Sequence, residues 1–207
     1  MSNQTISVKM FCVLSAILFI VGFAAARVAE PGKAISEPAI PDTVNPQYVI
    51  SVSISGEKIG DIVIELLPKF APKHVRNFDS LVAVMFYNGT LFHRIIPGFM
   101  IQGGDPGTKT KPRENWGNSD PTLTKVPAEF SELKHHRGAV SAARGKNINS
   151  ASTQFFICVD ERSDLDGNYS VFGNVLSGME VADKIVELSR DEGDRPIERV
   201  EMKIAKR

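Results

Sequence analysis

The sequence predicts a mainly β domain, in which a closed or nearly closed β-barrel is capped by two α-helices. Two observations lead to this prediction: many short segments alternate hydrophobic and polar residues, and only two segments repeat hydrophobic residues at helical spacing. The length of 207 residues suits one domain or two small ones. The chain shows no internal repeat of the kind that marks solenoids or propellers.

Residues 1–26 have the features of a secretory signal peptide or an N-terminal membrane anchor. Lys9 is their only charged residue, and the uncharged stretch 10–26 after it ends in three alanines, a small-residue cleavage site. We therefore expect an exported protein, periplasmic or secreted, and favour the periplasm. The alternative is membrane anchoring through residues 10–26, because this stretch lies at the lower edge of the length that spans a bilayer.

Residues 27–46 are predicted to form a flexible linker, and the folded domain is predicted to cover residues 47–207. Four prolines lie among small and charged residues in the linker, which has no hydrophobic periodicity. The domain opens with a predicted β-hairpin, in which residues 48–54 and 62–66 alternate hydrophobic and polar side chains around a turn at Gly56.

The first helix is expected to begin near Pro72, since hydrophobic residues from Val75 to Val82 then recur at near-helical spacing. A second helix follows a predicted capping box formed by Ser177 and Glu180, and its hydrophobic stripe runs from Val181 to Leu188. The remaining predicted strands cover residues 91–96, 99–102, 139–142, 154–159, 171–175 and 200–204.

Composition and motifs exclude several classes of function. The 24 basic and 24 acidic residues balance, with no dense basic block, so we expect no nucleic-acid partner. Cys12 and Cys158 form neither a disulfide framework nor a metal motif, and the adjacent His135 and His136 lack a ligand at helical spacing. Nucleotide-binding and serine-hydrolase signatures are absent, so no metal and no cofactor are expected.

Two runs carry the candidate site. In residues 92–105, strand alternation places Arg94 with Phe92 and Ile96, and after a Pro-Gly break it places Met100 with Gln102. In residues 152–158, Gln154 and Phe156 share one face. Such a patch could bind a ligand, but a solvated arginine, a core phenylalanine pair and a glycine bend would produce the same pattern.

The runs FHRIIPGFMIQGGD, STQFFIC, LDGNYSVFGNV and GMEVADKI occur in this order, and over residues 47–207 the chain resembles cyclophilin-type peptidyl-prolyl cis/trans isomerases. The resemblance implies a closed eight-stranded antiparallel β-barrel capped by two α-helices, with a binding groove on its outer face. It implies acceleration of rotation about X-Pro bonds, with proline-containing peptides and unfolded or folding proteins as partners. We expect a monomer that assists folding of exported proteins.

Carried over residue by residue, the resemblance implies that Arg94 is the catalytic residue. His93 is expected at the edge of the groove and Gln102 beside the arginine. The proline pocket is expected to consist of Phe99, Met100, Phe156 and Leu165, with Tyr169 as its cover. The groove for the flanking peptide backbone is expected to be lined by Ala143, Arg144 and Gln154. Amide resonance holds an X-Pro bond planar behind about 18–20 kcal/mol, and a guanidinium that donates toward the proline nitrogen would stabilise the twisted state.

The chain departs from the common family pattern at two positions. Asp164 stands where many members carry a Trp that is associated with tight cyclosporin binding, so cyclosporin binding is doubtful here. Tyr169 stands where many carry a His, and its amphipathic ring can still cover the pocket. The alternative function is a non-catalytic proline-peptide-binding or chaperone module that uses the same groove, for which Arg94 would not be required.

Overall fold

The structure is a computed structural model that describes residues 45–118 and 120–207. The predicted signal peptide or anchor and almost all of the predicted linker, through residue 44, lie outside the described residues. The first strand, β1, begins at Gln47, where the folded domain was expected to start.

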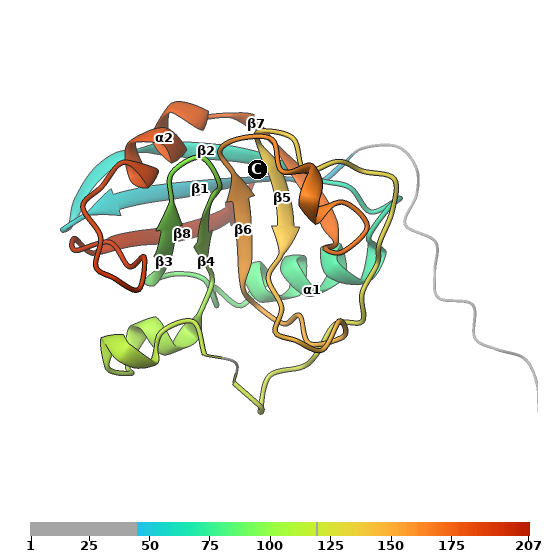
Figure 1. Cartoon of the computed structure of the whole chain (residues 1–207), viewed down its shortest axis with the longest axis horizontal. Helices are drawn as coiled ribbons and strands as arrows, with labels where there is room; N and C mark the ends of the chain where they lie inside the picture. Colours follow the sequence, from blue (N-terminus) through green and yellow to red (C-terminus); the bar gives the residue numbers. More distant parts are fainter. Residues whose placement is uncertain (1–44, 119) are drawn as a thin grey trace, which may run out of the picture. The chain divides into compact units, whose positions relative to one another are not determined.

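Eight antiparallel strands close into one barrel, which confirms the predicted fold class (Figure 1). Around the barrel the order is β1-β2-β7-β5-β6-β4-β3-β8, so most neighbours are distant in sequence. The strands are β1 Gln47–Ile54, β2 Glu57–Leu66, β3 Thr90–Ile96, β4 Met100–Gly103, β5 Ala139–Ala142, β6 Phe155–Cys158, β7 Val171–Ser177 and β8 Val200–Lys206.

The predicted hairpin is the pair β1 and β2, which are joined by a two-residue turn. Ser55 and Gly56 both have positive φ, 50° and 93°, as the tight hairpin turns that match strand twist require. Tyr48 pairs with Ile64 and Ile50 with Ile62, so the hydrophobic residues of both strands point into the barrel together.

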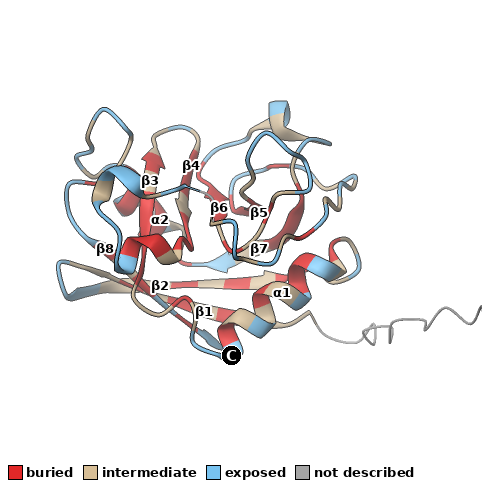
Figure 2. Cartoon of the chain, turned by 90° about the horizontal axis from the view of Figure 1, so that it is seen from below, coloured by how far each residue is buried: buried red, intermediate tan, exposed pale blue. Residues whose placement is uncertain are grey.

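Two helices lie on opposite sides of the strands (Figure 1). Helix α1, Pro72–Ala83, has Pro72 in its first turn as predicted, and buried and exposed residues alternate along it (Figure 2). Its N-cap residue, Ala71, has no capping side chain, and Glu129 from a distant segment instead accepts hydrogen bonds from the backbone N–H groups of Lys73 and His74, at 3.0–3.1 Å.

Helix α2, Met179–Val186, is correctly predicted, but the capping box at its start is wrong. Ser177 is the last residue of β7 and pairs with Val63 of β2, and no side chain caps the helix. The N-cap residue is Gly178 with φ of 90°, and a Cβ there would collide with the carbonyl oxygen of Asp61. The abrupt change from strand to helix therefore uses a glycine, because only glycine fits this backbone.

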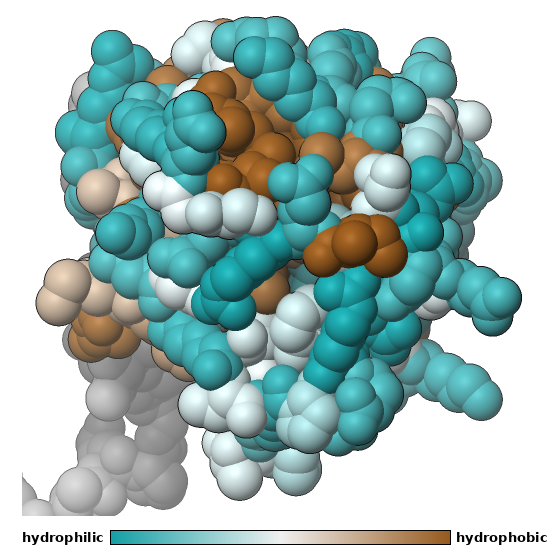
Figure 3. All heavy atoms as spheres, turned by 90° about the vertical axis from the view of Figure 1, so that its left-hand side faces the viewer, coloured by the Kyte–Doolittle hydropathy of each residue, from teal (hydrophilic) through white to brown (hydrophobic). Residues whose placement is uncertain are grey.

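The outer surface carries mixed polar and charged residues. On the face shown in Figure 3, hydrophilic residues predominate and hydrophobic residues gather in a few patches. Within the described part of the chain, no helix has both the length and the hydrophobicity needed to cross a membrane.

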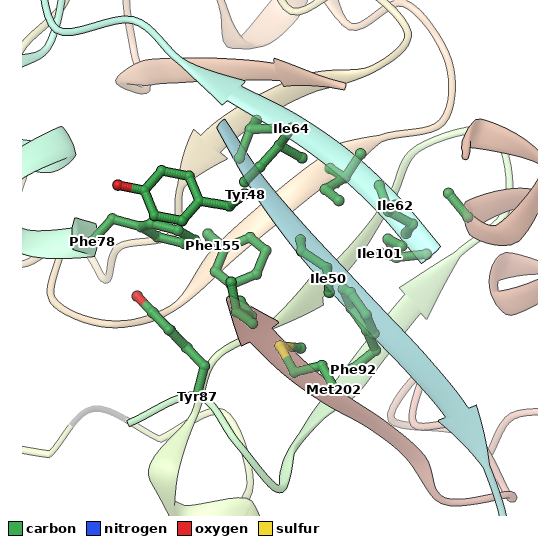
Figure 4. Close-up of a cluster of buried hydrophobic side chains, with 14 of the residues drawn as sticks. Tyr48, Ile50, Ile62, Ile64, Phe78, Tyr87, Phe92, Ile101, Phe155 and Met202 are labelled. Atoms are coloured by element: carbon green, nitrogen blue, oxygen red, sulfur yellow. The ribbon is translucent and has the colours of Figure 1, made fainter. Parts of the chain in front are cut away.

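The interior of the barrel is filled by aliphatic and aromatic side chains (Figure 4). Phe78 of α1 lies among four other rings, with centroid distances of 5.3 Å to Tyr48, 5.0 Å to Tyr87, 5.7 Å to Phe155 and 5.8 Å to Phe172. Val181, Ala182 and Ile185 of α2 belong to the same core. Both helices therefore contribute to one hydrophobic core, whose burial is the main stabilising term.

A second, smaller hydrophobic cluster lies on the outside of β4, β5, β6 and β7. Alternation on β4 and β6 directs Ile101, Phe155 and Ile157 inward and leaves Met100 and Phe156 in the outer cluster, as predicted for these two strands. The long connection 106–137 passes near it and contains two short 3-10 turns, η1 Pro106–Lys109 and η2 Arg113–Asn115. A packed cluster on the outer face of a barrel is where a binding site is to be sought.

Candidate active site

One small pocket opens on the outer cluster, and nine of the eleven predicted site residues line it. Its volume is about 100 Å³, below the range typical of sites for drug-sized ligands, so it suits a single small side chain. The lining residues are Arg94, Phe99, Met100, Gln102, Ala143, Arg144, Phe156, Leu165 and Tyr169. The two other predicted residues, His93 and Gln154, line adjoining pockets.

A bulge in β3 places Arg94 at the pocket. Phe92 pairs with Gly103 and Arg94 with Gln102, so His93 is an extra residue that shifts the alternation of the strand. The prediction that Phe92 shares a face with Arg94 is therefore wrong: Phe92 packs in the barrel core, whereas Ile96 does lie on the outer side. The Arg94 side chain is 43% exposed, and its Nη2 lies 3.7 Å from Oδ2 of Asp194.

Two glutamines continue the polar side of the pocket. Gln102 lies opposite Arg94 on β4, and its Nε2 donates to Oε1 of Gln154 over 2.9 Å. The side-chain Nε2 of Gln154 in turn donates to the carbonyl oxygen of Gly117 over 3.3 Å. The backbone carbonyl oxygen of Gln154 accepts from the backbone N–H of Ala143 over 3.0 Å. This chain of bonds fixes the two amides beside the guanidinium.

The hydrophobic side of the pocket is built from rings around a buried floor. Met100 is 1% exposed and Phe156 4%. The Phe156 ring lies edge-on to Phe99 at 6.3 Å and to Tyr169 at 5.8 Å between centroids. Arg162 lies over the outer face of Phe99, 3.8 Å from its centroid. The pocket therefore exists before any ligand binds.

His135 lies behind this wall and was not predicted as a site residue. Its ring stacks on Phe156 at 6.1 Å, its Nδ1 lies 3.0 Å from Oδ1 of Asp166, and its Nε2 lies 3.1 Å from Oγ of Ser141. Ser141 is fully buried, so this Ser-His-Asp arrangement cannot reach a substrate and is structural. Burial lowers the pKa of His135, and hydrogen bonds from the His135 backbone and ring hold the pKa of Asp166 at about 2.

Arg144 and Tyr169 form the rim of the pocket. The Arg144 guanidinium lies 4.5 Å from the Tyr169 ring centroid and donates to the carbonyl oxygen of Asn168 at 2.9 and 3.2 Å. Asp164, the departure from the common pattern, does not line the pocket. It lies in the 3-10 turn η3 Ser163–Leu165 and accepts two 2.8 Å hydrogen bonds from Arg162.

His93 was predicted at the groove edge and is in fact buried, with 2% of its surface exposed. It contributes to a polar pocket next to the first one, together with Arg94, Trp116 and Arg195. Burial lowers the pKa of its imidazole, so the ring is neutral near pH 7. Sequence patterns missed Trp116 and Arg195, because each comes from a loop that only the fold brings to the barrel face.

No set of three or more His, Cys, Asp or Glu side chains within residues 45–118 and 120–207 could hold a metal ion. The site therefore consists of a closed β-barrel face with a small hydrophobic pocket next to a guanidinium and two amides. These features define the class of protein as an isomerase of the peptidyl-prolyl type, which needs a ring-sized pocket and a fixed positive charge rather than a nucleophile.

Comparison with known proteins gives the family. Residues 49–207 match the model of the cyclophilin type peptidyl-prolyl cis-trans isomerase family, and the chain belongs to this family. A probable peptidyl-prolyl cis-trans isomerase from Brucella suis is 45% identical over 139 residues, which cover 65% of this chain and 71% of the relative. Peptidyl-prolyl cis-trans isomerase B from Saccharomyces cerevisiae is 40% identical over 174 residues, which cover 80% of each protein.

Solved structures agree with this assignment. The crystal structure of a Cryptosporidium parvum cyclophilin type peptidyl-prolyl cis-trans isomerase matches with a TM-score of 0.69 at 30% identity, covering 79% of this chain and 98% of that protein. A second structure of the C. parvum protein, determined in the presence of the dipeptide Ala-Pro, matches with a TM-score of 0.67 at 32% identity, covering 78% and 98%. The chain is thus a peptidyl-prolyl cis-trans isomerase, an enzyme whose family binds proline-containing peptides.

Proposed function

We propose that the small pocket binds the proline ring and that Arg94 is the catalytic residue. The observation that carries this proposal is the register of β3 and β4, which sets Arg94 beside Gln102 in the lining of the same pocket as Met100 and Phe156. A proline ring on this floor would bring its nitrogen within reach of the guanidinium. Binding of proline peptides alone would not require an arginine at this position, whereas stabilisation of the twisted amide uses its positive charge.

The proposed mechanism needs no covalent bond to the substrate. An X-Pro amide is planar because the nitrogen lone pair is delocalised, and rotation must overcome about 18–20 kcal/mol. A hydrogen bond from Arg94 toward the proline nitrogen favours a lone pair localised there, which is the electronic state of the twisted amide. The guanidinium therefore stabilises the transition state more than either planar isomer.

The residues around Arg94 hold the substrate in place and lower the local dielectric constant. The hydrophobic walls hold the ring while the preceding carbonyl group swings, and they exclude water from the arginine, which strengthens its electrostatic contact. Gln102 and Gln154, linked by their 2.9 Å hydrogen bond, offer amide groups to the backbone of the bound peptide. Ala143 and Arg144 extend the groove beyond the pocket.

This mechanism predicts a rate of the chemical step that changes little between about pH 6 and pH 9. A guanidinium keeps its proton in this range, burial lowers the pKa of both His93 and His135, and burial raises the pKa of the Cys158 thiol to about 12. Exchange rates of an Ala-Pro peptide measured by NMR at several pH values test this. A bell-shaped profile would show a general acid or base and contradict the mechanism.

We further propose that the enzyme acts on exported proteins, as a periplasmic or secreted protein. The support for this lies in the sequence of residues 1–26, with its lone Lys9, uncharged stretch and three terminal alanines. Mass spectrometry of the chain recovered from the periplasm of a bacterial host should give a new N-terminus at Arg27. The variant Leu18→Lys, which interrupts the hydrophobic stretch, should stay in the cytoplasm, whereas equal cytoplasmic retention of the unaltered chain would contradict export.

A further inference from the structure

A second pocket, polar and larger, adjoins the proline pocket on the same face. Its volume is about 340 Å³, and it shares Arg94, Gln102 and Arg144 with its neighbour. Trp116 from the long connection and Arg195 from the loop before β8 complete its walls. A peptide whose proline occupies the first pocket would therefore have neighbouring residues close to the second.

The charge of this pocket is strongly one-sided. Three guanidinium groups, those of Arg94, Arg144 and Arg195, line it, and no lining residue carries a carboxylate. Three acidic side chains lie around it: Asp194 is 3.7 Å from Arg94, and Asp105 and Asp191 accept hydrogen bonds of 2.7–2.9 Å from the backbone N–H groups of the lining residues Gly117, Gly193 and Arg195. Asp105 and Asp191 already accept from backbone N–H groups, and Asp191 also pairs with Arg113, so the guanidiniums of Arg144 and Arg195 can still attract an anionic side chain.

His93 gives an independent sign of a missing ligand atom. Its ring is almost fully buried, and within the described part of the chain neither ring nitrogen makes a well-aligned hydrogen bond, although the Leu91 backbone lies close enough to oppose the lowering of its pKa. Buried polar atoms are normally hydrogen-bonded, so the two ring nitrogens of His93 in the pocket wall indicate a position where a ligand atom or a water molecule can bind. Gly117 lies over the ring: a Cβ at this glycine, whose φ is 81°, would come within 3.3 Å of Nε2.

We propose that this pocket is a specificity subsite for the carboxylate of an Asp or Glu side chain close to the substrate proline. The inference rests on the proposed binding of proline in the neighbouring pocket. Arg195 is the residue that the subsite would use and that the proline pocket does not contain. A planar guanidinium matches a carboxylate with two parallel hydrogen bonds, so Arg195 is well suited to this recognition.

The test uses the full-length chain and peptides of the form acetyl-Ala-Ala-Pro-Ala-Ala-amide. In separate peptides, Glu or its neutral isostere Gln replaces each alanine in turn, and kcat/KM for cis/trans exchange is measured by NMR. At one position we expect Glu to exceed Gln by about twofold to fivefold, the range for a partly exposed ion pair. The preference should decrease between about 0.05 M and 1 M NaCl, because salt screens partly exposed charges.

Variants separate the subsite from general charge effects. Arg195→Gln should bring the Glu-to-Gln ratio close to 1, and Arg195→Lys, which keeps the charge, should retain part of the preference. Arg207→Gln, the same charge change at the end of β8 where Arg207 bonds to Gln47, should leave the ratio as in the wild type. Circular dichroism of each variant shows whether the loop substitution has unfolded the domain.

The outcomes distinguish the two proposals. If neutral peptides are turned over but no position shows a preference for Glu, or if the preference survives in Arg195→Gln, the subsite is disproved and the isomerase mechanism stands. If Arg207→Gln abolishes the preference as well, the effect is long-range charge and the subsite is again disproved. If neither the Glu peptides nor the neutral peptides are turned over, the proposed binding of proline in the small pocket is contradicted, and the subsite that rests on it is contradicted as well.

Discussion

At the scale of single residues, His135 shows how a side chain outside the pocket can set its shape. Its Nδ1 lies 3.0 Å from Oδ1 of Asp166 and its Nε2 lies 3.1 Å from the Ser141 hydroxyl, which itself donates to the carbonyl oxygen of Ser170, while the ring face packs against Phe156 and the ring edge lies near Tyr169. Leu165, another pocket residue, is next to Asp166 in the chain. His135 is therefore a positioning residue that joins the wall of the pocket to β5.

We predict that His135→Phe keeps the ring contact with Phe156 but lowers kcat/KM by about fivefold to tenfold, because the pocket wall loses its fixed position. Leaving Asp166 and Ser141 without their partner should also lower the free energy of unfolding by about 1–3 kcal/mol. The NMR signals of the Phe156 and Tyr169 rings report on the position of the wall directly. His136→Phe, at the exposed neighbour, is the control and should change neither the rate nor these signals.

The residue scale also shows what sequence patterns can and cannot predict. Alternation correctly placed Met100, Gln102 and Phe156 outside the barrel, because β4 and β6 are regular in this region. It failed for Phe92, since a bulge changes the parity of a strand and leaves no reliable mark in the sequence. The partners of His135 lie 6 and 31 residues away, so only the fold reveals what this histidine does.

At the scale of elements, the junctions between strands and helices determine where each helix begins and what caps it. The pattern of Ser177 and Glu180 resembles a helix cap, but the pairing of Ser177 with β2 takes precedence, and Gly178 makes the turn instead. Helix α1 is capped by Glu129, which lies 55 and 56 residues beyond the N–H groups that it accepts from. Helix positions were therefore predictable from hydrophobic spacing, whereas their caps were not, because the caps depend on tertiary contacts.

We predict that Gly178→Ala lowers the free energy of unfolding by about 2–4 kcal/mol, through both a left-handed backbone and a collision with Asp61. Gly56→Ala is the matched control: it has a similar φ of 93° and open space around it, so only the backbone strain of about 1 kcal/mol should appear. Urea unfolding curves of both variants measure the difference. Equal losses at the two positions would show that the close approach to Asp61 is unimportant.

At the scale of the whole molecule, the sequence predicted the class of the fold better than its topology. The number and alternation of the strands indicate a barrel, and the closed strand order around a mainly aliphatic interior confirms it. The order around the barrel brings β3 beside β8 and β2 beside β7, and these pairs are separated by more than 100 residues. Alternation alone contains no information on such partners, and the order of strands around the barrel was not predicted.

The stability of the whole domain should depend on pH through the pair of His135 and Asp166. The pKa of Asp166 is about 2 in the folded state, below about 3.9 in an unfolded chain, so its stabilisation is complete above about pH 5 and is lost as the pH falls toward 2. The lowered pKa of His135 acts in the same direction, since protonation below about pH 6.5 favours the unfolded state.

We therefore predict that Asp166→Asn destabilises the domain more at pH 6 than at pH 2.5, because only the wild type can lose the contribution of the charged carboxylate. Denaturant unfolding at several pH values measures this difference. Glu198→Gln, at an exposed position on the loop before β8, is the control and should give a nearly constant effect. A difference between wild type and Asp166→Asn that did not vary with pH would contradict the predicted role of the pair.

The central claim is that Arg94 accelerates rotation of an X-Pro bond by electrostatic stabilisation in a preformed pocket. The most direct measurement is NMR exchange between the cis and trans forms of an Ala-Pro peptide, with the wild type, Arg94→Ala and the control Arg199→Ala. We predict fast exchange with the wild type and the control. With Arg94→Ala the rate constant should fall by at least about a hundredfold, although this variant should still bind the peptide. Undiminished exchange in Arg94→Ala would contradict the account.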